Sequence, residues 1–315
     1  MERVHDTYDL VIAGGGPAGI EALLQATSRG MRAVLLEREE AGAVIAATMS
    51  GKRFYHAYGR NAAPPSGLLY FPDRKIGSEL VEGWKKQLAG LSYLPHTIFS
   101  GITQDAGGYA FATDKGVFRA PRMILATGTF TTPRKLAVPG EIDNRHIAYE
   151  FDYRELPMDK QMLVVGGGNS AVESALELSL DNAVTLVVRK PALAETVTER
   201  NRAELDKEVS KGAIKLLFET RPVAFAENVV TLDCRGKTSS ETFDRIYVHI
   251  GYEKPEAWLR SLDLSVGPLG FPALSQNLET SRANIFVAGA LAGSDSIVGS
   301  ANQAIEIVER ITHNA

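Results

Sequence analysis

The chain carries one local pattern twice, and this repeat limits its possible folds more than any other feature. Residues 8–37 contain an apolar run (YDLVIA), a glycine loop (GGGPAG), an Ala- and Leu-rich stretch and a second apolar run, and residues 161–190 repeat this order around GGGNSA. A strand that turns through glycines into a helix and then a further strand is a βαβ unit. The pattern therefore predicts two α/β units, with helices over residues 17–29 and 169–179.

The spacing of the glycines predicts what the two loops bind. In a G-x-G-x-x-G loop the first glycine allows a tight turn, the second lets the backbone approach a pyrophosphate, and the third lets helix and strand pack closely. The N-terminus of the helix then offers N–H groups to the negative charge. Each loop follows a predicted strand and opens a predicted helix, so we expect both to bind dinucleotides. The three positions are Gly14, Gly16 and Gly19 in the first copy, and Gly166, Gly168 and Ala171 in the second.

The ends of the following strands distinguish the two ligands. Glu37 stands 23 residues after Gly14, and Arg189 stands 23 residues after Gly166, with Lys190 beside it. A carboxylate at this position accepts hydrogen bonds from ribose hydroxyls and repels a 2′-phosphate, whereas arginine offers charged donors to that phosphate. We therefore expect FAD or NAD in the first unit and NADP(H) in the second. The alternative is that Arg189 and Lys190 form a solvated strand end.

Composition excludes several classes of protein. At 315 residues, two domains are expected. A net charge of −4 argues against a nucleic-acid-binding protein. The charged start MERVHDTYDL does not suit a signal peptide, and no run approaches the ~20 apolar residues that span a bilayer. We expect a cytoplasmic protein with no nucleic-acid or membrane partner.

Cys234 is the only cysteine. A single cysteine cannot form an intramolecular disulfide, a CxxC redox pair or a cysteine-rich metal site within this chain. No metal is expected. We interpret Cys234 as a small buried apolar residue.

Other segments complete the expected organisation. A helix is predicted over 78–90, short antiparallel strands near 109–120, a strand at 123–128, and a strand followed by a helix from 284 to 311. Residues 41–75 are expected to be irregular, and the proline-containing stretch 131–144 is expected to connect two domains.

Five motifs in order resemble the thioredoxin reductase-like branch of the pyridine nucleotide–disulfide oxidoreductases, over nearly the whole chain. They are GGGPAG with Glu37, ATG at 126–128, GGGNSA with Arg189 and Lys190, IGYEKP at 250–255, and NIFVAGA at 284–290. The resemblance implies two Rossmann-like domains of the three-layer ββα type. It implies an FAD-binding domain of residues 1–132 and 256–315, an inserted NADPH-binding domain of residues 133–255, and a homodimer.

The resemblance also implies the cofactor contacts. No side chain is expected to be catalytic, because the flavin accepts the hydride directly. FAD contacts are expected at Gly14, Gly16, Pro17, Ala18, Gly19, Glu37, Arg38, Thr127, Gly128, Gly289, Ala290, Asn302 and Gln303. NADPH contacts are expected at Gly166, Gly168, Asn169, Ser170, Ala171, Arg189, Lys190 and Gly251.

Two positions depart from the family pattern. Family reductases have a CxxC pair 14 to 17 residues before the second glycine loop, where this chain has roughly Tyr149 to Asp152. Their AGD motif, whose aspartate binds the flavin ribitol, is AGA here. Either Asp295 compensates for Ala290, or FAD is held less tightly.

The sequence does not identify the molecule that accepts the electrons. We expect transfer from NADPH to FAD and then to an external low-molecular-weight disulfide or small redox protein. The alternatives are a ferredoxin–NADP⁺ reductase and a non-catalytic, nucleotide-sensing or scaffold flavoprotein. The absence of a C-terminal extension after Ala315 weighs against the ferredoxin reductase.

Several bases and aromatic residues allow two interpretations each. Segment 52–75, which includes Tyr58 and Arg60, is either a basic face for an acidic or anionic acceptor or a solvated loop. His56 is a proton donor or a structural residue. Arg200 and Arg202 either contact phosphate or begin a solvated helix.

Overall fold

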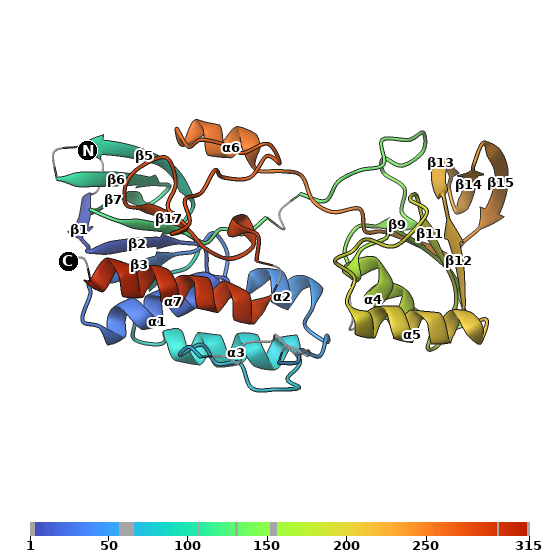
Figure 1. The fold of residues 1–315 in the computed structure, drawn as a ribbon, viewed down its shortest axis with the longest axis horizontal. Coiled ribbons are helices and arrows are strands. Elements are labelled where there is room, and N and C mark those ends of the chain that lie inside the picture. The colour runs from blue at the N-terminus through green and yellow to red at the C-terminus, as the bar shows by residue number, and fades with distance from the viewer. Residues whose placement is uncertain are drawn as a thin grey trace. The chain divides into compact units, whose positions relative to one another are not determined.

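The computed structural model describes residues 4–56, 66–105, 107–129, 132–151, 156–294 and 296–313, and the chain divides into two compact units (Figure 1). The first unit contains residues 1–130 and 254–315, so it includes both chain ends. The second contains residues 131–253. The second unit is thus an insertion within the first.

A five-stranded parallel sheet lies at the centre of the first unit, in the order β17-β8-β2-β3-β4. Its inner strands are buried on both faces, which explains why they are continuous apolar runs in the sequence. The strands are β2 (Leu10–Ala13), β3 (Ala33–Leu36), β4 (Tyr93–Leu94), β8 (Met123–Leu125) and β17 (Ile285–Val287).

Helices cover one face of this sheet and a second sheet covers the other. Helices α1 (Pro17–Ser28) and α7 (Ile297–His313) lie side by side (Figure 1), and α3 (Gly77–Leu88) contributes to the same apolar core. The second sheet has the order β1-β7-β6-β5, and Phe111 and Phe118 are fully buried between the sheets. Its strands are β1 (Val4–Thr7), β5 (Phe99–Asp105), β6 (Gly108–Thr113) and β7 (Gly116–Ala120); the unit also contains α2 (Ala43–Thr48), α6 (Glu256–Ser261) and the 3₁₀ turn η1 (Gly289–Ala292).

The second unit repeats this plan on a smaller scale. A parallel sheet of order β12-β11-β10-β16-β9 packs against α4 (Asn169–Leu178) and α5 (Glu199–Ser210) on one face, and against the antiparallel sheet β13-β14-β15 on the other. The strands are β9 (Ile147–Ala148), β10 (Gln161–Val165), β11 (Ala183–Val188), β12 (Ile214–Phe218), β13 (Thr220–Ala226), β14 (Val229–Cys234), β15 (Lys237–Thr242) and β16 (Arg245–Val248).

The predicted fold class is confirmed: each unit has a central parallel sheet between a helical layer and a smaller second sheet. The second sheet is antiparallel in the second unit, and in the first unit it is antiparallel except for the parallel pair of β1 and β7. Both repeated helices form where the sequence predicts them, at 17–28 and 169–178. Within the described residues, no helix is both long and apolar enough to cross a membrane.

Residues 41–75 are not wholly irregular, which corrects the sequence-based expectation. Helix α2 forms after Gly42, whose φ of +73° is favourable for glycine and whose N–H donates to the carbonyl of Gly15 at 2.8 Å. Its six residues are too few for a periodic pattern. Burial of Ile45 beside α3 stabilises the helix.

Cys234 is exposed, so its interpretation as a buried residue is wrong. It follows Val230 and Leu232 on the inner face of β14, by the alternation of a strand. The strand ends there, at a turn in which Arg235 and Gly236 have positive φ angles. The thiol therefore lies beyond the edge of the core that its neighbours fill.

Candidate functional site: two glycine loops

At two positions of the first loop, the surrounding backbone leaves no room for any residue larger than glycine. Gly14 has a φ of +109°, and a Cβ there would lie 2.3 Å from the carbonyl oxygen of Ala126. A Cβ on Gly19 would lie 1.9 Å from the carbonyl oxygen of Gly14. These contacts bring the ends of β2 and β8 against the start of α1, as the tight-turn and close-packing roles demand.

Gly16 and the corresponding Gly168 are different. Their φ angles of −82° and −100° suit any residue, and no described atom beyond their chain neighbours lies within 4 Å of an added Cβ. Neither backbone strain nor protein packing therefore requires glycine at these two positions. The free space beside the backbone fits a pyrophosphate at both loops.

The two helices that follow these loops begin without a side-chain cap. Helix α5, in contrast, begins with the Thr198 hydroxyl accepting from the N–H of Asn201 at 3.2 Å. At the start of α7, the Ser296 hydroxyl accepts from the N–H of Gly299 at 3.0 Å. Neither α1 nor α4 has such a side-chain bond at its N-cap. Their first N–H groups are available to an anion.

Further predicted FAD residues lie close to the first loop. Gly289, the first residue of η1, packs on Ala18, with 3.2 Å between an added Cβ and the Ala18 methyl. The Gln303 side chain accepts from the Gly289 N–H at 2.8 Å, and so holds η1 against α7. Thr127 follows Ala126 directly, and its hydroxyl is buried without a partner among the described residues. An unsatisfied buried hydroxyl is expected where a ligand completes the site.

Glu37 stands at the end of β3 with its carboxylate over the loop. It accepts hydrogen bonds from the N–H of Gly15 and, at 2.8 Å, from the N–H of Glu39. Arg38 is exposed and pairs with Glu39 at 3.2 Å.

Two further predicted FAD residues lie elsewhere in the first unit. Gly128 has a φ of +68°, and the half-buried Ala290 lies in η1. Asp295, named as a substitute for the missing aspartate, lies outside the described residues.

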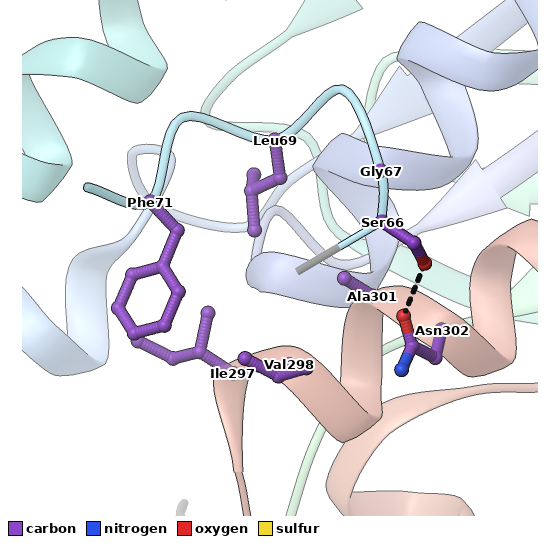
Figure 2. A pocket seen from close by; sticks show the side chains of 8 residues that line it. All are labelled: Ser66, Gly67, Leu69, Phe71, Ile297, Val298, Ala301 and Asn302. Carbon is purple, nitrogen blue, oxygen red and sulfur yellow. Dashed lines mark hydrogen bonds between the residues drawn. The ribbon is translucent and has the colours of Figure 1, made fainter. Parts of the chain in front are cut away.

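Figure 2 shows an apolar hollow at the start of α7. Leu69 and Phe71 point from the segment 66–71 toward Ile297, Val298 and Ala301 of α7. At one end, the Ser66 hydroxyl donates to the side-chain oxygen of Asn302 at 3.1 Å. Asn302, a predicted FAD residue, therefore lies at the rim of a hollow.

The described part of segment 52–75 is less basic than its sequence indicates. Lys75 pairs with Glu79 at 2.7 Å and Arg74 with Asp73 at 3.5 Å. The hydrogen bond to Glu79 is the main cause that raises the pKa of the Lys75 ammonium. The ring of His56 lies 2.7 Å from the carbonyl oxygen of Phe71, which indicates a structural role. Tyr58 and Arg60 lie outside the described residues.

In the second unit, Gly166 has a φ of +150°, and an added Cβ would lie 2.2 Å from the carbonyl oxygen of His249. The same Cβ would lie 2.9 Å from the Ala171 methyl, so this alanine occupies the close-packing position. Gly251, two residues after His249, has a φ of +89° and accepts from the N–H of Arg134 at 2.9 Å.

Arg189 and Lys190 directly follow β11, and their exposed side chains make no ion pair or hydrogen bond to a described residue. The loop that follows them is tied to the glycine loop. The N–H of Ala194 donates to the Gly167 carbonyl at 2.8 Å. The side chain of Asn169 donates to the Thr196 carbonyl at 2.8 Å and accepts from the Thr198 N–H at 3.0 Å.

Arg202 stabilises this same loop. Its guanidinium donates to the carbonyls of Val197, at 3.1 Å, and Ala194. Arg200 pairs with Glu204 within α5 at 3.0 Å. Ser170, a predicted NADPH contact, is exposed in the first turn of α4. Of the four cations that the sequence singles out in this unit, Arg189 and Lys190 are thus the two whose side chains have no ion pair or hydrogen bond to a described residue.

His249 was not singled out by the sequence. Its ring lies 3.0 Å from the Ser174 hydroxyl and stacks on Tyr247, directly behind the glycine loop. Burial disfavours the charged ring and lowers the pKa of His249 to about 4. The one feature of the sequence that pointed to His249 is its position directly before the IGYEKP motif. A lone histidine next to a predicted strand does not indicate whether its ring is buried.

Tyr149, in the stretch that replaces the cysteine pair, is part of a polar cluster. Its hydroxyl donates to Glu141 at 2.7 Å, and Lys135 lies 3.2 Å from the centre of its ring. Burial, together with the bond to Glu141, raises the pKa of Tyr149. The Glu141 carboxylate is 4% exposed and also accepts from the N–H groups of Leu136 and Ala137. The cluster fixes the connecting segment; Asp152 lies outside the described residues.

Comparisons with known proteins agree with this arrangement. The family model for "pyridine nucleotide-disulphide oxidoreductase" matches residues 8–307. A ferredoxin–NADP reductase of Levilactobacillus brevis is 28% identical over 304 residues, covering 90% of this chain and 85% of the relative.

Two solved structures share the fold. A bacillithiol disulfide reductase from Bacillus cereus has a TM-score of 0.85 at 20% identity, covering 98% of this chain and all of the other. The thioredoxin reductase of T. acidophilum has a TM-score of 0.81 at 19% identity, covering 98% and 99% of the two chains.

Proposed function

Because the chain belongs to the pyridine nucleotide-disulphide oxidoreductase family, we propose that it passes electrons from NADPH through FAD to an external acceptor without a redox disulfide of its own. It is an FAD-dependent NADPH oxidoreductase. The proposed acceptor is a low-molecular-weight disulfide or a small redox protein. We also propose a homodimer, an FAD domain of residues 1–132 and 256–315, and an NADPH domain of residues 133–255.

The main support for this proposal is the open space beside Gly16 in the first glycine loop and beside Gly168 in the second, which we call the two cradles. Gly16 and Gly168 leave space that the polypeptide does not need, at the starts of two uncapped helices. The carboxylate of Glu37 lies beside the first cradle, and Arg189 and Lys190 directly follow the strand next to the second. A free ribose suits the acid and a 2′-phosphate suits the two bases, so the first cradle takes FAD and the second NADPH.

The chain's own residues bind and orient the cofactors. FAD supplies the hydride-accepting ring when bound. In the first unit, the proposed contacts are the glycine loop, Glu37 for the ribose, Thr127 with its unsatisfied hydroxyl, and Asn302 at the start of α7. In the second, the N–H groups of α4 hold the pyrophosphate, while Asn169 fixes the loop after Arg189 and Lys190.

The acceptor must meet the flavin directly, since one cysteine cannot form an intramolecular dithiol. The second candidate function is ferredoxin–NADP⁺ reduction, which is supported by the name of the Levilactobacillus brevis relative. The acids that pair with Arg74 and Lys75 reduce the positive charge available to an acidic ferredoxin, so we place this candidate second.

Anaerobic titration of the purified protein tests the proposal. We expect a flavin absorbance spectrum that bleaches faster with NADPH than with NADH. Colourless protein that takes up no added FAD would contradict the function and favour a scaffold. NADPH consumption with a panel of low-molecular-weight disulfides and ferredoxins then identifies the acceptor class.

A further inference from the structure

Glu21 is a fully buried carboxylate in the first helix of the FAD-binding unit, and nothing in the proposed function uses it. It lies in α1 between two apolar residues, Ile20 and Ala22, with 0% of its surface exposed. A buried carboxylate is costly unless its oxygens accept hydrogen bonds. Its partners therefore indicate what it does.

The Glu21 carboxylate binds a short stretch of backbone on a distant segment. One oxygen accepts from the N–H of Leu68 at 2.9 Å, and the other accepts from the N–H of Leu69 at 2.6 Å. Gly67 packs so closely that an added Cβ would lie 2.5 Å from the same carboxylate. Glu21 thus holds residues 67–69 against α1.

A line of side chains stabilises the buried charge. The Gln25 amide donates to Glu21, and its oxygen accepts from the Arg29 guanidinium. Arg29 in turn pairs with Glu309 of α7 at 3.2 Å. The positive charge of Arg29 polarises the amide that faces Glu21, so the carboxylate is compensated without a cation in contact.

The segment that Glu21 holds is one wall of the hollow in Figure 2. Leu69 and Phe71 form this wall, and α7 forms the opposite wall, with Asn302 at the rim. Gln87 supports the segment from the other side. It accepts from the Tyr70 N–H and donates to the Leu68 carbonyl, both at 2.7 Å.

We propose that Glu21 is a positioning residue for flavin: by anchoring residues 67–69 it keeps the wall of the hollow in place, so that the FAD site at the start of α7 is preformed. This inference rests on the proposed FAD site, through Asn302. A preformed wall lowers the ordering cost of binding and should therefore raise the affinity for FAD.

The first test is Glu21→Gln, which keeps the shape of the side chain. A glutamine offers one acceptor oxygen, and its NH₂ group would face a backbone N–H that has lost its partner. In the apoprotein we expect hydrogen exchange at the amides of Leu68 and Leu69 to become at least tenfold faster. We expect the dissociation constant for FAD to rise about tenfold, with altered vibronic structure in the visible spectrum of bound flavin.

Glu141→Gln is the matched control. Glu141 is also a buried carboxylate that accepts from neighbouring backbone N–H groups, those of Leu136, Ala137 and Val138, but it belongs to the second unit. This variant should leave exchange at Leu68 and Leu69, FAD affinity and the flavin spectrum unchanged. Gly67→Ala is a second perturbation that retains the carboxylate, because its methyl would push the segment away from Glu21. Gly67→Ala should change FAD affinity and the flavin spectrum in the same direction as Glu21→Gln. It therefore tests the inference even if Glu21→Gln does not fold.

Three results would overturn the inference. These are unchanged exchange at Leu68 and Leu69 in Glu21→Gln, faster exchange with unchanged FAD binding, and equal loss of FAD affinity in Glu21→Gln and Glu141→Gln. Failure of the wild-type protein to bind FAD is a separate result, which contradicts the proposed function. The exchange measurement on the apoprotein distinguishes the two failures.

Discussion

At the scale of single residues, the glycines of each loop divide into two kinds. Gly14, Gly19 and Gly166 are required by carbonyl oxygens of the chain itself, at 1.9 to 2.3 Å from an added Cβ. Gly16 and Gly168 have no such neighbour in the part of the chain that the structure describes. The first kind serves folding, whereas the second fits the cofactor contacts that we propose, although all five belong to the same sequence pattern.

Substitution at Gly168 and Gly166 should separate these two roles. Gly168→Ala should change the free energy of unfolding by less than about 1 kcal/mol, because alanine at an N-cap is sterically allowed. It should weaken NADPH binding at least tenfold, because the methyl enters the cradle. Gly166→Ala should instead destabilise the second unit, since its Cβ meets the His249 carbonyl. Chemical denaturation and NADPH titration measure both effects; intact NADPH binding by Gly168→Ala would contradict the assigned cradle.

The charge of Arg189 should determine the choice between the nicotinamide cofactors. Arg189→Glu should raise the KM for NADPH tenfold or more, because a carboxylate repels the 2′-phosphate, with little effect on NADH. Lys237→Glu on β15 is the control, since it makes the same kind of charge change at an exposed position of the second unit. Rates of flavin reduction with the two cofactors provide the measurement. An unchanged preference would remove the phosphate-binding role of Arg189.

At the scale of elements, the end of β16 supports the second glycine loop. His249 presents its carbonyl to Gly166 and its ring to Ser174 of α4. Its ring is neutral in the folded protein down to a pKa of about 4, against about 6.5 in an unfolded chain. The second unit therefore contains a histidine that must stay uncharged for the strand, the loop and the helix to pack as they do.

Stability of the second unit should fall as acid is added. The unfolded state binds a proton at His249 below about pH 6.5 and the folded state does not until about pH 4. The stabilisation is complete above pH 6.5 and is lost as pH falls toward 4, at no more than about 1.4 kcal/mol per pH unit from this group. Denaturation of wild type and His249→Asn at pH 7 and pH 5 measures it. We expect a smaller pH dependence in the variant, and an equal dependence would contradict this origin.

Long elements with a regular pattern were predicted well, and short ones were not. Helices α1 and α4 follow from their glycine loops and apolar spacing. Helix α2 has six residues, and it depends on the packing of Ile45 near α3 and on the bond between Gly42 and Gly15. Contacts between segments distant in sequence stabilise α2, so no local pattern predicted it.

At the scale of the whole molecule, the electron route should need no protein thiol. Cys234 is exposed at a hairpin turn and is the only cysteine. Cys234→Ser should therefore keep NADPH-dependent flavin reduction and turnover with the acceptor within about twofold of wild type. The native protein should react with one equivalent of a thiol reagent under the same conditions. Loss of acceptor turnover alone would show that the thiol takes part.

The sequence by itself determined the two α/β units, the positions of both loops and the opposite charges at Glu37 and Arg189. These features are local, because strand, turn, helix and strand end follow one another within about 30 residues. Only the tertiary structure decided which glycines face open space, that the Thr127 hydroxyl has no partner within the described residues, and that Cys234 is exposed. It also placed Glu21 against Leu68 and Leu69, 47 and 48 residues away. Burial and contact between distant segments arise only when the chain folds, and no spacing along the sequence encodes them.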